Sequence, residues 1–160
     1  MLQLLVRGSI VALLAFGGAA CSLSADAARD EDGTITESAE VDAFNVRPGD
    51  CFDMPDGLLI ESVAAVPCTE PHDSQAFRAF DITGFESLPS ETEIEDLVIE
   101  GCLGAHFEDF VGVPYELSAL SVTWLEPTEE TWDRVDDREI LCIITNEAAM
   151  LTSDARNSSV

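Results

Sequence analysis

The chain has 160 residues, with 32 acidic side chains against seven arginines and no lysine, and its formal net charge is −25. This length fits one domain, and an apolar content of 46% is enough for a hydrophobic core. The charge excludes nucleic-acid binding, because a phosphate backbone requires a basic surface, and an anionic lipid surface would repel the chain.

The first twenty residues have the pattern of an export signal. Arg7 precedes an apolar run from Ile10 to Ala20, which ends directly at Cys21. This run is too short for a membrane-spanning helix, which needs about 20 apolar residues. A cysteine directly after small residues resembles a bacterial lipoprotein signal, in which that cysteine is lipidated and begins the mature chain. We therefore predict a signal peptide over 1–20 and lipidation at Cys21; a secreted protein and an uncleaved anchor are the alternatives.

Residues 21–44 are rich in acids and poor in large apolar side chains. The segment after Cys21 contains seven acids and one arginine, separated by small residues. Such a composition buries too little apolar surface to offset its chain entropy. We predict a disordered acidic tether over 21–44, one compact domain over 45–151 and a flexible tail over 152–160.

The domain contains alternating and continuous apolar runs that predict strands, and one helical pattern. The helix begins at Ser90, where Ser90 and Glu93 form the S-x-x-E capping box, and it ends by Gly112. A short helical turn is expected after Glu126. Strands are expected over 58–66, 75–82, 117–125 and 138–145. These elements predict an α+β fold: a small, mostly antiparallel sheet of four or five strands, packed by one main helix.

Four cysteines remain once Cys21 is assigned to lipidation. They are Cys51, Cys68, Cys102 and Cys142. Four cysteines in an exported domain predict two disulfides, for which three connectivities are open. We favour Cys51–Cys68 with Cys102–Cys142, because the first pair flanks a short segment that can fold as a hairpin. The chain has no C-x-x-C motif, so the spacing argues against a zinc site.

His72 is the side chain with the most chemical potential. It follows Pro71 and lies between Glu70 and Asp73, where an imidazole can serve as a base, a metal ligand or a pH sensor. The alternative is a structural histidine that fixes the turn beside a disulfide. The chain has no G-x-S-x-G motif for a nucleophile. We predict no catalytic residue, no cofactor and no metal site.

The last part of the domain contains an acidic turn and both tryptophans. Asp136 and Asp137 precede Arg138, without the residue order of a calcium loop, and Arg138 is expected to pair with a neighbouring acid. Trp124 and Trp132 bracket the predicted helical turn, and we expect both in the core.

Several short motifs, taken in order, resemble a known family. They are Gly49-Asp50-Cys51-Phe52, Val66-Pro67-Cys68-Thr69-Glu70-Pro71-His72, Cys102 with Phe110-Val111-Gly112 behind it, and Pro127-Thr128 with Trp132, Asp137-Arg138 and Cys142. Over roughly Pro48 to Cys142 this series resembles the actinobacterial septum-formation domain family. The acid common shortly after the Pro-His pair in that family is Gln75 here. The resemblance implies an extracytoplasmic, membrane-associated protein linked to cell division, and no established enzymatic activity.

The sequence therefore predicts a non-catalytic cell-envelope lipoprotein, anchored by Cys21 on the extracytoplasmic side of the cell membrane or, alternatively, secreted. Its expected partners are an envelope or divisome protein or a wall component; its oligomeric state is left open. The residues expected to matter through the family motifs are Gly49, Asp50, Pro71, His72, Trp132 and Arg138. The alternative function is a small-ligand or metal-binding sensor module centred on His72.

Overall fold

The computed structural model describes residues 26–57, 59–146 and 148–160. The predicted signal peptide and the predicted lipidation site, Cys21, lie outside these residues. Among the described residues no helix is long and apolar enough to cross a membrane.

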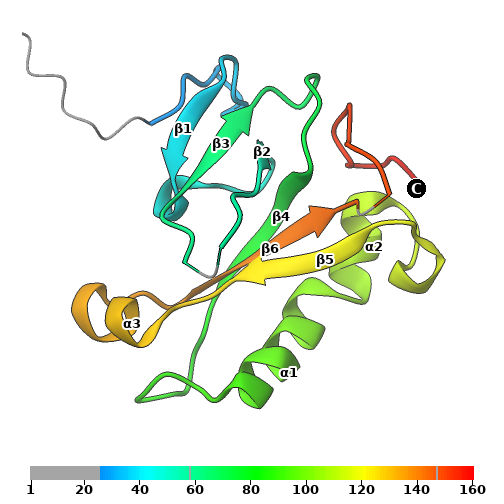
Figure 1. The fold of residues 1–160 in the computed structure, drawn as a ribbon. Coiled ribbons are helices and arrows are strands. Elements are labelled where there is room, and N and C mark those ends of the chain that lie inside the picture. The colour runs from blue at the N-terminus through cyan, green and yellow to red at the C-terminus, as the bar shows by residue number, and fades with distance from the viewer. Residues whose placement is uncertain (1–25, 58, 147) are drawn as a thin grey trace, which may run out of the picture.

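The structure is an α+β fold, as predicted, built on one antiparallel sheet with the strand order β1-β3-β2-β4-β6-β5 (Figure 1). The strands are β1 (Ala39–Asp42), β2 (Cys51–Asp53), β3 (Ser62–Val66), β4 (Ser74–Asp81), β5 (Ser121–Leu125) and β6 (Glu139–Thr145). The helices are α1 (Glu91–Cys102), α2 (Ala105–Val111) and α3 (Glu129–Val135), with 3-10 turns η1 (Ala43–Asn45) and η2 (Tyr115–Leu117). The described part of the chain thus has six strands rather than the four or five expected, because β1 and the short β2 were not predicted.

Helix α1 begins at the predicted capping box. The Glu93 carboxylate accepts hydrogen bonds from the backbone N–H and the hydroxyl of Ser90, at 2.8 and 2.7 Å, and these bonds lower the pKa of Glu93. The expected single helix is in fact two helices, because the chain turns at Gly104, which has φ +57°. The second helix, α2, ends at Gly112 in the left-handed conformation, as a helix C-terminus often does.

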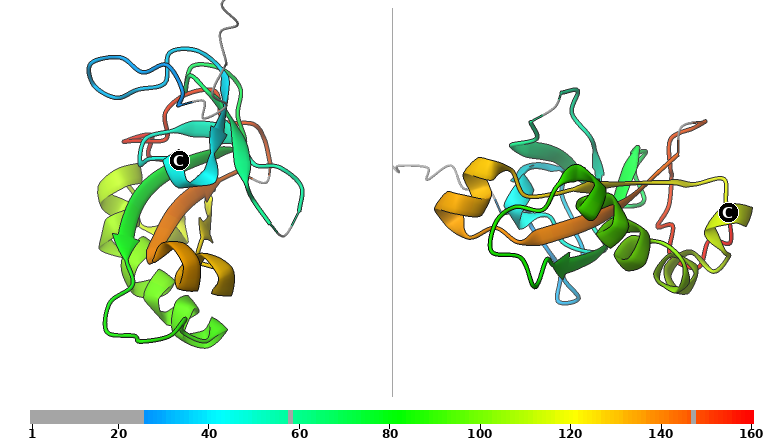
Figure 2. Two further views of the ribbon diagram at one scale, coloured as in Figure 1. Left: turned by 90° about the vertical axis from the view of Figure 1, so that its left-hand side faces the viewer. Right: turned by 90° about the horizontal axis from the view of Figure 1, so that it is seen from below.

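Two apolar cores lie on opposite faces of the sheet. Helices α1 and α2 cover one face of β4, β6 and β5 (Figure 2). Alternation along β6 supplies both cores: Ile140, Cys142 and Ile144 pack toward the helices, and Leu141 and Ile143 pack toward the N-terminal strands. This burial on both faces explains why the apolar run of β6 is nearly unbroken.

The predicted disordered tether is wrong for residues 26–44. Ala27, Ile35 and Val41 are buried in the second core, and β1 pairs with β3 at one edge of the sheet. The acids between these residues point to solvent, so a few well-spaced apolar side chains are enough to attach the segment.

The predicted flexible tail is also wrong. Ala155 is buried, and the N–H groups of Asn157 and Ser159 donate to the carbonyls of Phe110 and Val111, at 2.8 and 2.9 Å. The last carbonyls of a helix have no partner within it, and the tail supplies partners for those of α2. The folded domain therefore includes both segments that flank the predicted range 45–151.

Candidate functional site

Both predicted disulfides are present. Cys51–Cys68 and Cys102–Cys142 have Cα–Cα distances of 5.1 and 5.6 Å. The antiparallel pairing of β2 with β3 sets Cys51 opposite Val66, which brings Cys68 within reach just after the strand ends. The second disulfide joins the last turn of α1 to β6 inside the core. Cys68 is half-buried and the other three cysteines are buried, so the first disulfide is the one nearer the surface.

Asp50, in the Gly-Asp-Cys motif, binds the N-terminal segment to the turn before β2 through Arg29. Its buried carboxylate accepts two hydrogen bonds from the Arg29 guanidinium, at 2.5 and 2.8 Å, and one from the backbone N–H of Arg47, at 2.8 Å. The hydrogen bonds to Asp50 raise the pKa of Arg29 against the opposing effect of burial. A bidentate ion pair of this kind fixes the orientation of the guanidinium relative to the carboxylate as well as the distance between them.

Gly49 permits the turn that places Asp50. Its φ of +105° lies in the region that disfavours a side chain, and its N–H donates to the carbonyl of Ala76 at 2.7 Å. The Gly-Asp pair of the motif is therefore explained by backbone geometry and by one buried ion pair.

His72 is a structural residue in this fold. Its side chain is 0% exposed, and its backbone N–H and carbonyl pair with Leu151 at 3.0 and 2.8 Å. Nδ1 lies 2.7 Å from the carbonyl oxygen of Glu70, which can only accept, so Nδ1 carries the proton and donates. Nε2 is buried and has no hydrogen-bond partner among the described protein atoms. The imidazole is closed to solvent, which argues against the alternative of a small-ligand or metal-binding sensor module centred on His72.

Gln75 makes structural contacts at this site that the sequence did not predict. It is fully buried in β4, where its Nε2 donates to the Asp154 carboxylate at 2.9 Å and its Oε1 accepts from the N–H of Ala155 at 2.7 Å. The side-chain amide thereby attaches the C-terminal segment to the sheet next to the first disulfide. A carboxylate at this position could not donate to Asp154, so the amide suits this chain's own C-terminal segment.

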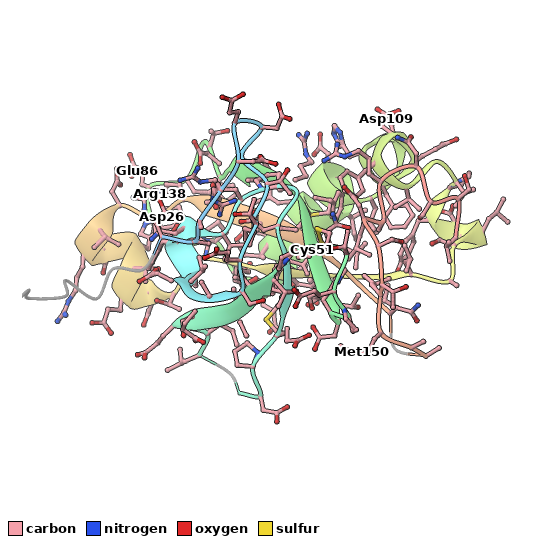
Figure 3. All side chains as sticks on the ribbon, turned by 90° about the horizontal axis from the view of Figure 1, so that it is seen from above. Asp26, Cys51, Glu86, Asp109, Arg138 and Met150 are labelled. Carbon is pink, nitrogen blue, oxygen red and sulfur yellow. A yellow bond between two sulfur atoms is a disulfide. The ribbon has the colours of Figure 1, made fainter. Side chains whose placement is uncertain are left out.

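The N-terminal segment, the motif turns and the C-terminal segment enclose an open hollow of about 480 Å³ beside the first disulfide, which we call the motif hollow. It is lined by Asp32, Gly33, Thr34, Ile35, Pro48, Gly49, Asp50, Pro67, Cys68, Thr69, Ser153, Asp154 and Arg156. Figure 3 shows Cys51 near the middle of the molecule, with carboxylate oxygens around the outline. The lining offers the carboxylates of Asp32, Asp50 and Asp154, hydroxyls, backbone groups and the guanidinium of Arg156, a set that suits hydrogen bonding to a polar partner.

Trp132 and Arg138 form a second motif cluster, at the junction of α3 and β6 and away from Cys51 (Figure 3). Trp132 is buried, and the Arg138 guanidinium carbon lies 3.5 Å from the centroid of its ring. Arg138 also donates to the carbonyls of Trp132 and Asp137, and its predicted pairing with an acid is made with Asp136 at 2.7 Å. This cluster closes the turn between the two elements. Trp124, by contrast, is half-buried: it packs against the edge of the helix-side core and is not enclosed by it as expected.

Among residues 26–57, 59–146 and 148–160, no group of three or more His, Cys, Asp or Glu side chains is arranged to bind a metal ion.

Comparison with known families identifies the class of protein that this framework defines. Residues 18–142 match the septum-formation family, and the chain belongs to that family. The match covers the whole motif series and extends upstream of the resemblance noted in the sequence. This membership links the chain to septum formation. No curated protein and no solved structure matched the chain.

Proposed function

We propose that this protein is a non-catalytic envelope lipoprotein whose extracytoplasmic domain binds an envelope or divisome protein, or a wall component, during septum formation. The family match over residues 18–142 carries this proposal. The predicted lipidation of Cys21 supplies the anchor to the membrane.

The two disulfides support an extracytoplasmic location. Structural disulfides persist in oxidising compartments and are rare in the reducing cytosol. The buried Cys102–Cys142 bond connects α1 to β6, so the helix-side core is built around an oxidised pair.

The arrangement of the motif residues supports a binding rather than a catalytic role. Asp50 is engaged by Arg29, and His72 is buried with Nδ1 and both backbone groups hydrogen-bonded. Trp132 and Arg138 fix a turn. These motif residues therefore stabilise the fold. A partner would bind to other, exposed surfaces of the domain.

The septation role is tested by deleting the gene and measuring septum position and cell length by microscopy. We expect misplaced or delayed septa, restored by the wild-type gene. Normal septa at a normal growth rate would show that the proposed role is wrong.

The anchor is tested by metabolic labelling with a palmitate analogue followed by membrane fractionation. We expect label in the wild-type protein and none in the Cys21→Ala variant, which should leave the membrane fraction. Equal labelling of both proteins, or of neither, would contradict lipidation at Cys21.

A further inference from the structure

A second hollow, of about 200 Å³, lies between α1 and β5, and we call it the α1–β5 hollow. It is lined by Glu95, Val98, Ile99, Leu103, Tyr115, Val122 and Trp124. Figure 1 shows α1 running beneath β5, and β5 is the last strand in the strand order of the sheet. Ile99 is 60% exposed, although it stands among apolar and aromatic neighbours. The lining is therefore an apolar surface open to solvent, and a large side chain could fill it.

The strand beside this hollow is an edge strand. In the part of the chain that the structure describes, β5 pairs with β6 and with no other strand, and it ends the strand order. An edge strand presents backbone N–H and carbonyl groups to which another extended segment can pair. Val122 and Trp124, two residues apart on β5, both line the hollow, so alternate side chains of an added strand would lie on that same face.

The charge of this region selects the partner. Between Arg78 and Arg134 the sequence contains 14 acidic residues and no arginine or lysine, and this stretch includes α1, α2 and β5. Glu95 lines the hollow itself, and Glu126 accepts a hydrogen bond from the Trp124 indole. A partner segment with basic side chains would be attracted here, whereas anionic lipid and a second copy of this chain would be repelled.

We propose that the α1–β5 hollow and the free edge of β5 bind an extended, cationic segment of a partner protein. The segment pairs with β5 as an added strand, places one apolar side chain between Ile99 and Trp124, and directs its basic side chains to the surrounding carboxylates. This inference rests on the proposed interaction role in septum formation and states the chemistry of the partner.

The direct test titrates the purified protein with the synthetic peptide Lys-Val-Lys-Phe-Lys-Val-Lys. Trp124 lines the hollow and Trp132 is 3% exposed in the core, so a change in tryptophan emission reports on the hollow. We expect saturable binding that weakens about tenfold between 50 and 500 mM NaCl, because salt screens the attraction. The counterpart with glutamate in place of each lysine should not bind.

Matched variants locate the binding surface. Ile99→Asp should weaken binding at least tenfold, because it places another carboxylate in the apolar lining. Val135→Asp is the control: Val135 is 65% exposed at the end of α3 and outside the lining, and this variant should bind within twofold of wild type. Circular dichroism of both variants verifies the fold.

Two N-methylated peptides test the strand pairing. One carries N-methyl groups on its odd-numbered residues and the other on its even-numbered residues, so only one of them blocks the edge that faces β5. We expect one peptide to lose binding and the other to retain it. Equal binding of both would overturn the pairing.

The failure of this inference can be distinguished from failure of the proposed function. If the deletion strain has defective septa but the peptide does not bind, or binds the Ile99→Asp and Val135→Asp variants equally, the docking surface is wrong and the septation role stands. If the deletion strain septates normally, the proposed function fails whatever the peptide does. Defective septa in an Ile99→Asp strain, with normal septa in a Val135→Asp strain, would support both.

Discussion

At Gly101, α1 packs against the ring of Phe80 on β4 with no room for a side chain. A Cβ atom at this position would overlap the ring of Phe80 on β4. The next residue, Cys102, forms the buried disulfide to β6, so the helix cannot move away easily. Gly101 is therefore required by packing, although glycine is unfavourable inside a helix.

We predict that Gly101→Ala lowers the free energy of unfolding. Alanine gains about 1 kcal/mol in helix propensity, but overpacking against Phe80 costs roughly 1–3 kcal/mol, so the net loss in urea denaturation should be up to about 2 kcal/mol. The double variant Gly101→Ala/Phe80→Leu should recover part of the loss. Additive effects of the two substitutions would contradict the proposed contact.

At the residue scale, local signals were predictable and distant partners were not. Ser90 and Glu93 lie within one turn, so the cap was evident from the sequence. Gln75 bonds to Asp154 and Ala155, about 80 residues away, and no pattern in the sequence connects them. The two tryptophans look alike in the sequence but differ in exposure. Trp124 lines the α1–β5 hollow at the edge of the sheet, whereas Trp132 is buried in the core.

At the scale of secondary-structure elements, the pairing of β4 with β6 places two acidic residues opposite each other. Asp81 and Glu139 are cross-strand partners at the ends of these strands. Partial burial, followed by repulsion from Asp81 and Asp137, raises the pKa of Glu139. Because the folded state binds this proton more tightly than the unfolded state, the carboxylate destabilises the fold above the raised pKa. This penalty shrinks as the pH falls from the raised pKa toward the ordinary pKa of a glutamate and is absent below it.

We predict that Glu139→Gln raises the free energy of unfolding at pH 7 by about 0.2–1 kcal/mol, the usual effect of like charges in opposite positions. The gain should shrink at acidic pH, where wild-type Glu139 is protonated. Urea denaturation at several pH values measures it. Glu31→Gln, in an exposed loop before β1, removes one charge without this pairing, and an equal gain there would assign the effect to net charge alone.

The elements also show where sequence patterns were insufficient. The continuous apolar run of β6 and the helical spacing of α1 predicted both elements. The strand β1 was missed because one buried residue, Val41, stands among acids, and its burial depends on β3 and on the Arg29–Asp50 pair.

At the scale of the whole molecule, the two disulfides close loops of different length, with sequence separations of 17 and 40 residues. In the chain-entropy model these loops contribute about 3 and about 4 kcal/mol. The longer one also lies inside the helix-side core, whereas Cys68 of the shorter one lines the motif hollow.

We predict that the Cys102→Ala/Cys142→Ala variant loses more stability than the Cys51→Ala/Cys68→Ala variant, by at least about 1 kcal/mol in denaturant unfolding. The added loss comes from removing two sulfur atoms from a packed core as well as from loop entropy. A larger loss in the Cys51→Ala/Cys68→Ala variant would show that the motif hollow, rather than the core, determines stability.

These cross-links have a mechanical consequence under the proposed anchoring of the chain through Cys21. Under a pull on its two ends, the segments inside each disulfide loop cannot be drawn out, which shortens the fully extended molecule by about 200 Å at roughly 3.5 Å per residue. The first part to yield should be the segment before β2, which is attached by the β1–β3 pairing and the Arg29–Asp50 pair and is outside both loops. Such a domain would lengthen at its anchored end under load while the body that carries the α1–β5 hollow stays folded.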